Sequence, residues 1–145
     1  MIIVNDIIKA IESVAPLNWQ ESYDNAGLQV GGRFQLVSGV FFFLDVTEAV
    51  VDEAISMGYN LIVSHHPLLF KGLKSITGNS YVERIVIKAI QHNIAIYAAH
   101  TNLDNAPEGV SYRMARKLGL TSIRVLDPLC GRLIKLVTYV LSPPF

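Results

Sequence analysis

The 145-residue sequence has little cysteine, no net charge and no long apolar segment. Its single cysteine, Cys130, cannot form an internal disulfide, which favours a reducing compartment, so we expect a cytoplasmic protein. Basic and acidic residues number twelve each, and this balance gives no overall attraction for nucleic acid, which is not an expected partner. The N-terminus lacks the basic start of a secretory signal, and apolar runs such as residues 40–44 are far too short to span a membrane.

Apolar residues are abundant instead, at 51% against 17% charged residues, which is more apolar than an average soluble domain. Such an excess is typical of a sheet buried on both faces or of a surface that packs on another subunit, and we expect both. Hydrophobic periodicity and punctuating glycines and prolines predict helices over 5–14, 47–57, 80–92 and 107–118, and strands over 36–44, 61–63, 94–98 and 133–141. Residues 18–34 are expected to form an ordered loop.

Strands that alternate with helices at this spacing predict an α/β fold with a mainly parallel sheet flanked by helices. We expect residues 1–130 to form one α/β domain. Residues 133–141 resemble a first strand with no following strand to pair with. Either this strand returns to the first sheet, or residues 131–145 are the truncated start of a second domain or insert, which is the organisation we expect.

Polar side chains that can hold a ligand gather at the predicted strand ends. The first strand ends at Asp45 and the second at His65 and His66, while the third is followed by residues 100–104, which contain His100, Asn102 and Asp104. Open parallel sheets bind ligands beyond the carboxyl ends of their strands. Three of the four histidines of the chain fall at such ends, and this placement predicts a site there.

Imidazoles beside a carboxylate form a ligand set for Zn, Fe, Mn or Co. Each residue also has a simpler interpretation. The pair His65-His66 can form a surface turn before proline, and Asp104 can cap the helix expected from residue 107. Asp45 can cap the helix that follows it. His100 can hydrogen-bond the backbone, or orient a ligand rather than bind metal itself.

Four motifs in the chain resemble those of the Nif-three-like family, and they occur in the same order. Members of this family are often named GTP cyclohydrolase 1 type 2 homologues. The resemblance runs from about Ile7 to Val140. The motifs are Tyr-Asp-Asn-Ala-Gly-Leu-Gln-Val-Gly at 23–31, Leu-Asp-Val-Thr at 44–47, Ser-His-His-Pro-Leu at 64–68 and His-Thr-Asn-Leu-Asp at 100–104.

The resemblance implies a dinuclear centre with two divalent ions (Zn, Fe, Mn, Ni or Co) in a ring-shaped homohexamer. Its first-half ligands correspond to His65, His66 and Asp104. His100 would lie in the cavity, and we place Asp45, Asn25 and Asn102 around the same site. The implied activity is a metal-dependent hydrolase of GTP cyclohydrolase type, acting on a small nucleotide-like substrate. The alternative is a non-enzymatic metal-binding regulatory or scaffold protein.

Full-length members of the family add a histidine and a glutamate from a His-x-x-x-Glu motif near the C-terminus. No histidine follows His100 in this sequence. We therefore expect an N-terminal portion of a longer protein, with an incomplete site that holds one ion weakly or none by itself. An inactive fragment is the corresponding third interpretation.

Overall fold

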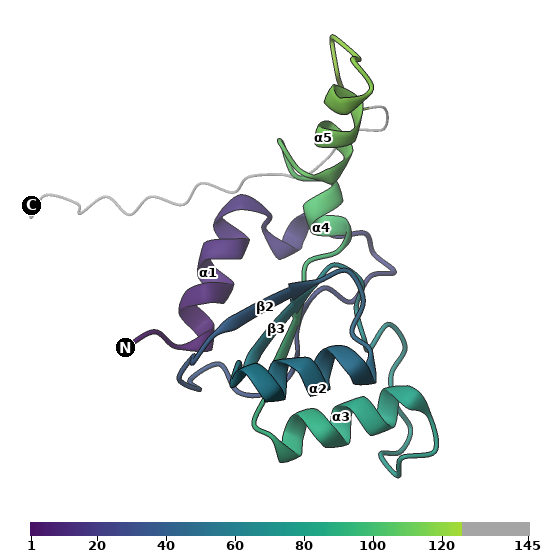
Figure 1. Cartoon of the computed structure of the whole chain (residues 1–145). Coiled ribbons are helices and arrows are strands. Elements are labelled where there is room, and N and C mark those ends of the chain that lie inside the picture. The colour runs from purple at the N-terminus through teal and green to yellow at the C-terminus, as the bar shows by residue number, and fades with distance from the viewer. Residues whose placement is uncertain (126–145) are drawn as a thin grey trace, which may run out of the picture.

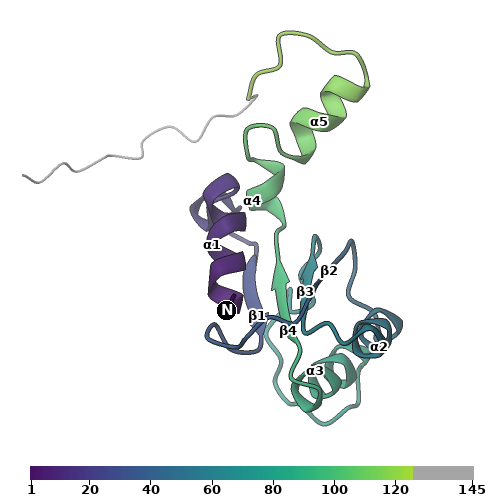
Figure 2. The ribbon, with the colours of Figure 1, turned by 60° about the vertical axis from the view of Figure 1, so that its left-hand side comes forward.

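The computed structural model describes residues 1–125. A four-stranded sheet of β1 (Gly27–Val30), β2 (Val40–Phe43), β3 (Leu61–Ser64) and β4 (Ala95–Ala98) forms its centre. Helix α1 (Val4–Val14) covers one face of the sheet, and α2 (Glu48–Met57) and α3 (Tyr81–Gln91) cover the other (Figures 1 and 2). The predicted α/β fold with helices on both faces is confirmed.

The strand order is β1-β4-β3-β2. Strands β2, β3 and β4 are parallel, as predicted, whereas β1 lies at the edge and pairs with β4 in the antiparallel direction, with Gly27 opposite Ala98. The prediction of a loop over 18–34 is wrong here, because this stretch contains β1 and the end of the short 3-10 helix η1 (Leu17–Trp19). Gly27 and Gly31, both with positive φ, delimit the four-residue strand, so its sequence resembles a turn.

Both faces of the sheet are buried, which explains the high apolar content. Along β3, Leu61 and Val63 pack on the α1 side, while Ile62 packs against α2 and α3. Strand β4 repeats the alternation, with Tyr97 facing α1 and Ile96 facing the opposite layer. Because successive side chains of a strand point to opposite faces, each strand contributes to two apolar clusters.

The main helices lie within about a residue of their predicted bounds, and the largest difference follows β4. A four-residue helix, α4 (Thr101–Asp104), comes first, and α5 (Val110–Lys117) begins three residues later than predicted. No residue of α5 is buried. The helix extends away from the sheet beyond α4 (Figure 1).

The strand predicted over 133–141, Cys130 and the second-domain start at 131–145 lie outside the described residues. Within residues 1–125, no helix combines the length and the apolar character that crossing a bilayer requires.

The loop before α3 is closed by a buried carboxylate. The Oε2 atom of Glu83 accepts the backbone N–H and the hydroxyl of Thr77, both at 2.9 Å, and the backbone N–H of Asn79. Ser80 caps the helix by accepting the N–H of Glu83 at 3.2 Å, and its hydroxyl also contacts Oε1. These bonds, first those from Thr77, outweigh the opposing effect of burial and lower the pKa of Glu83 from 4.5 to about 2.

Glu83 therefore stabilises the fold above its ordinary pKa, and this contribution is lost as the pH falls through about 2. We expect Glu83→Gln to reduce the free energy of unfolding at pH 7, and its difference from wild type to shrink only between pH 4.5 and about 2. Urea unfolding across this range measures the effect. Glu53→Gln, on an exposed position of α2, is the control. A Glu83→Gln difference that vanishes already at pH 5 would contradict the assignment.

Candidate metal centre

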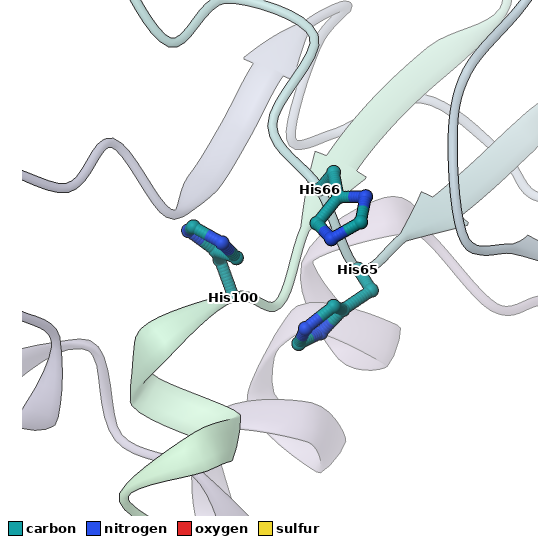
Figure 3. A group of neighbouring side chains, drawn as sticks. All are labelled: His65, His66 and His100. Atoms are coloured by element: carbon teal, nitrogen blue, oxygen red, sulfur yellow. The ribbon is translucent and has the colours of Figure 1, made fainter. Parts of the chain in front are cut away.

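Three histidine side chains converge at the carboxyl edge of the parallel strands (Figure 3). His65 and His66 follow β3 directly, and His100 lies two residues after β4. One ring nitrogen of each lies within 4.8 Å of the other two, and the ring centroids are 5.0 to 5.7 Å apart. Parallel strands end at the same edge, so residues far apart in sequence meet there.

The ring of His65 is oriented by the backbone. Its Nδ1 lies 2.9 Å from the carbonyl oxygen of Ala99, so Nδ1 carries the proton and donates. Its Nε2 lies 3.6 Å from Oδ1 of Asp104, too far for a hydrogen bond. Two ligands that share one tetrahedral ion at about 2.0–2.1 Å lie about 3.4 Å apart. The separation of these two atoms therefore suits joint ligation better than direct pairing.

His66 is paired with Asp45. Its Nδ1 lies 2.8 Å from Oδ1 of Asp45, and both side chains are about half exposed. The N-cap of α2 is Thr47, whose side chain accepts the N–H of Val50 at 3.2 Å. Asp45 thus orients an imidazole, while the hydroxyl two residues later caps the helix.

His100 is held by Asp24, a residue that the sequence analysis placed only in the loop over 18–34 and in the motif at 23–31. The carboxylate is fully enclosed and accepts the Nδ1–H of His100 at 2.8 Å. It also accepts the backbone N–H of Thr101 at 3.0 Å and the Thr101 hydroxyl. Burial raises the pKa of Asp24, but these bonds and one from the N–H of Asn25 outweigh it, so the pKa is lowered and the carboxylate stays charged.

The register of β1 and β4 explains this contact. Gly27 lies opposite Ala98 in the antiparallel pair, and Asp24 precedes Gly27 by three residues, just as Thr101 follows Ala98 by three. The only sequence signal was an acidic residue inside the motif at 23–31. The pairing of the two strands was needed to find it.

The two asparagines predicted near the site support its backbone. Asn102 is fully buried, accepts the N–H of His100 at 2.9 Å and donates to the carbonyl of Ala15 at 2.7 Å. Asn25 donates its side-chain amide to the carbonyl of Leu69, in the loop after His66. Both amides fix segments that carry histidines.

Asp104 does not cap the helix that follows it. The N-cap of α5 is Gly109, and no side-chain bond is made there. Asp104 instead ends α4, with its side chain 30% exposed and directed toward His65. Asp104 thus lies near Nε2 of His65, whereas Asp45 and Asp24 contact the Nδ1 atoms of the other two imidazoles.

All three histidines therefore share one arrangement. Each Nδ1 donates to an acceptor, either a carbonyl or a carboxylate, so each Nε2 keeps its lone pair. Metal-binding histidines are oriented in this way, and their outer partners set the tautomer and the ring direction. The donor set fits a divalent transition ion such as Zn²⁺.

Comparisons with known proteins agree on the relatives of this chain. The model of the Duf34/NIF3 family (NGG1p interacting factor 3) matches residues 2–140. A Staphylococcus aureus (strain MRSA252) protein named GTP cyclohydrolase 1 type 2 homolog is 42% identical over 137 residues, which are 94% of this chain and 37% of that protein. A Clostridium perfringens protein of the same name is 40% identical over 124 residues, covering 86% of this chain and 47% of its own length.

Solved structures give the same result. The crystal structure of a Bacillus cereus protein related to NIF3 superimposes with a TM-score of 0.81 at 45% identity, covering 88% of this chain and 35% of that one. The chain thus spans less than half the length of these relatives.

Proposed function

This chain belongs to the Duf34/NIF3 family, and from that membership we propose that it binds divalent metal and forms part of a metal-dependent hydrolase. The observation that carries the proposal is the common orientation of His65, His66 and His100, each held at Nδ1 and free at Nε2. Surface histidines without a ligand need no such arrangement. Asp104, 3.6 Å from His65, adds the carboxylate.

The spread of the donors favours two ions in the complete protein. Ligands about 2.1 Å from one ion lie no more than about 4.2 Å apart, whereas two ions about 3.5–4 Å apart accept a wider set. The three ring nitrogens extend over a region of up to 4.8 Å. Further ligands would come from the part of the relatives that this chain does not span. We expect these 145 residues to hold one ion with low affinity.

Bound divalent ions would supply Lewis acidity and activate water at neutral pH. The protein's own contribution is orientation: Ala99, Asp45 and Asp24 fix the three imidazoles before any substrate arrives. The site is open to solvent on the side of His66 and Asp45, whose side chains are 47% and 60% exposed. A substrate would enter from there.

The names of the relatives suggest GTP as the first substrate to test. We expect the full-length protein to release formate from GTP only when loaded with Zn²⁺, Mn²⁺, Fe²⁺, Co²⁺ or Ni²⁺, and a chelator to abolish turnover. Metal analysis after equilibrium dialysis should give about one ion per chain for residues 1–145. No bound ion at millimolar metal would refute the site, and two tightly bound ions would refute our account of the missing ligands.

A non-enzymatic role is the second candidate, supported by the family description as an interacting factor. In that case a metal-loaded assembly, expected to be a homohexamer, would bind a macromolecular partner without turnover. Metal-dependent capture of a partner, together with no turnover of GTP or related purine nucleotides, would favour it. Sedimentation of the full-length protein tests the hexamer separately.

A further inference from the structure

A half-exposed aromatic ring stands beside the histidine cluster. Phe70 lies in the loop between β3 and α3, and its ring is 6.3 Å from that of His100 and nearly perpendicular to it, at 87°. The residue is 45% exposed although its side chain is large and apolar. Aromatic walls next to a few fixed polar groups are typical of small-molecule sites.

The backbone before Phe70 is held by two hydrogen bonds at Leu69. Leu69 donates its N–H to the side-chain carbonyl of Gln29 at 2.9 Å, and its carbonyl accepts the amide of Asn25. The side chains of Leu68 and Leu69 pack against the core formed by the sheet, α2 and α3. Because these contacts hold the preceding residues in place, the ring of Phe70 stays exposed. A pre-positioned aromatic ring loses little entropy when a ligand stacks on it.

Two cations follow on the same loop. Lys71 and Lys74 are both exposed, which gives the segment after Phe70 a positive charge. A flat ring surface next to a cationic segment matches a ligand that joins a heteroaromatic base to a phosphate. Stacking on an aromatic side chain accepts any base, since every base has a π-face.

We propose that Phe70 is the base-stacking residue of this site and that its ligand is a nucleotide. This inference rests on the proposed function, because it takes the histidine cluster to be the reacting centre. It adds the residue that recognises the substrate ring. Phe70 is not a metal ligand, so its replacement leaves the donor set of the cluster unchanged.

The test is calorimetric titration of the 145-residue chain with guanosine 5′-monophosphate and with ribose 5-phosphate, each with and without Zn²⁺. We expect Phe70→Leu to weaken guanosine 5′-monophosphate binding roughly tenfold and Phe70→Trp to preserve it. Ribose 5-phosphate affinity and Zn²⁺ content should not change in either variant. Phe34→Leu is the matched control, because Phe34 is 83% exposed beyond the opposite end of β1.

The outcomes separate the two proposals. A wild-type chain that binds Zn²⁺ but no guanosine 5′-monophosphate, or a Phe70→Leu chain that binds it normally, would overturn the stacking role alone. Failure of the wild type to bind Zn²⁺ would count against the metal site instead. A Phe70→Leu variant that changes only the sedimentation coefficient would assign the ring to a protein interface and also overturn the stacking role.

Discussion

His65→Ala is expected to lower the affinity of the chain for Zn²⁺ by at least about a hundredfold. Loss of an outer hydrogen-bonding partner alone typically costs about 10–100-fold in metal affinity, and removing a ligand costs more. His65 lies beside Asp104, so its loss also removes the ligand atom with which that carboxylate would share an ion. Competition with a chromophoric chelator measures the affinity, and in the full-length protein GTP turnover should be lost with the metal.

His92→Ala is the matched control for this experiment. His92 is the fourth histidine of the chain, exposed at the end of α3, before β4 begins and therefore away from the carboxyl edge. The His92→Ala variant should bind Zn²⁺ with the affinity of the wild type. Equal affinity in His65→Ala and His92→Ala would show that the cluster is not the binding site.

Asp24→Asn is expected to weaken Zn²⁺ binding by about 10–100-fold, although Asp24 would act only through His100 and not as a ligand itself. The enclosed carboxylate accepts His100 at one oxygen and Thr101 at the other. An amide has only one oxygen, so its NH₂ group would meet one of these donors. We expect the fixed tautomer of His100 to be lost, because its Nδ1–H no longer has a reliable acceptor.

Nitrogen-15 NMR of the His100 ring measures the tautomer directly, which a purely structural role of Asp24 would not change. Thr101→Ala separates the two effects, since it removes the hydroxyl bond and keeps the Asp24–His100 contact. It should lower thermal stability but leave the tautomer intact. Asp52→Asn controls for the lost charge, because Asp52 pairs with Lys88 on the helical layer. An unchanged His100 tautomer in Asp24→Asn would contradict the prediction.

Much of the framework was predictable because it depends on local patterns. The apolar periodicity of α2 and α3 and the continuous apolar runs of β3 and β4 identify their element types with few errors in the bounds. The motif order led to the family, which the comparisons confirm. The assignment of His65, His66 and Asp104 as ligands stays a prediction. The structure groups His65 and His66 with His100 and places Asp104 3.6 Å from His65.

The strand predicted over 36–44 is shorter than expected, since β2 begins at Val40. The other errors concern segments whose conformation depends on distant partners. Strand β1 has only four residues, the first of them a glycine, and it becomes a strand because β4 offers an edge to pair with. The start of α5 was also predicted wrongly, because the short helix α4 and the turn after it occupy residues before Val110. No local signal distinguishes such segments from ordinary loops.

By itself, the sequence determined the alternation of strands and helices and the position of three histidines at strand ends. These follow from side-chain periodicity within single elements. Only the tertiary structure decided which acceptor orients each imidazole. Asp24 and His100 are 76 residues apart in the chain. They meet because β1 pairs with β4 in the antiparallel direction, which places the residues before β1 beside the residues after β4. The free Nε2 of His100 is a consequence of that pairing. The orientation of His65 and His66 depends instead on the parallel pairing that places β3 beside β4 and β2.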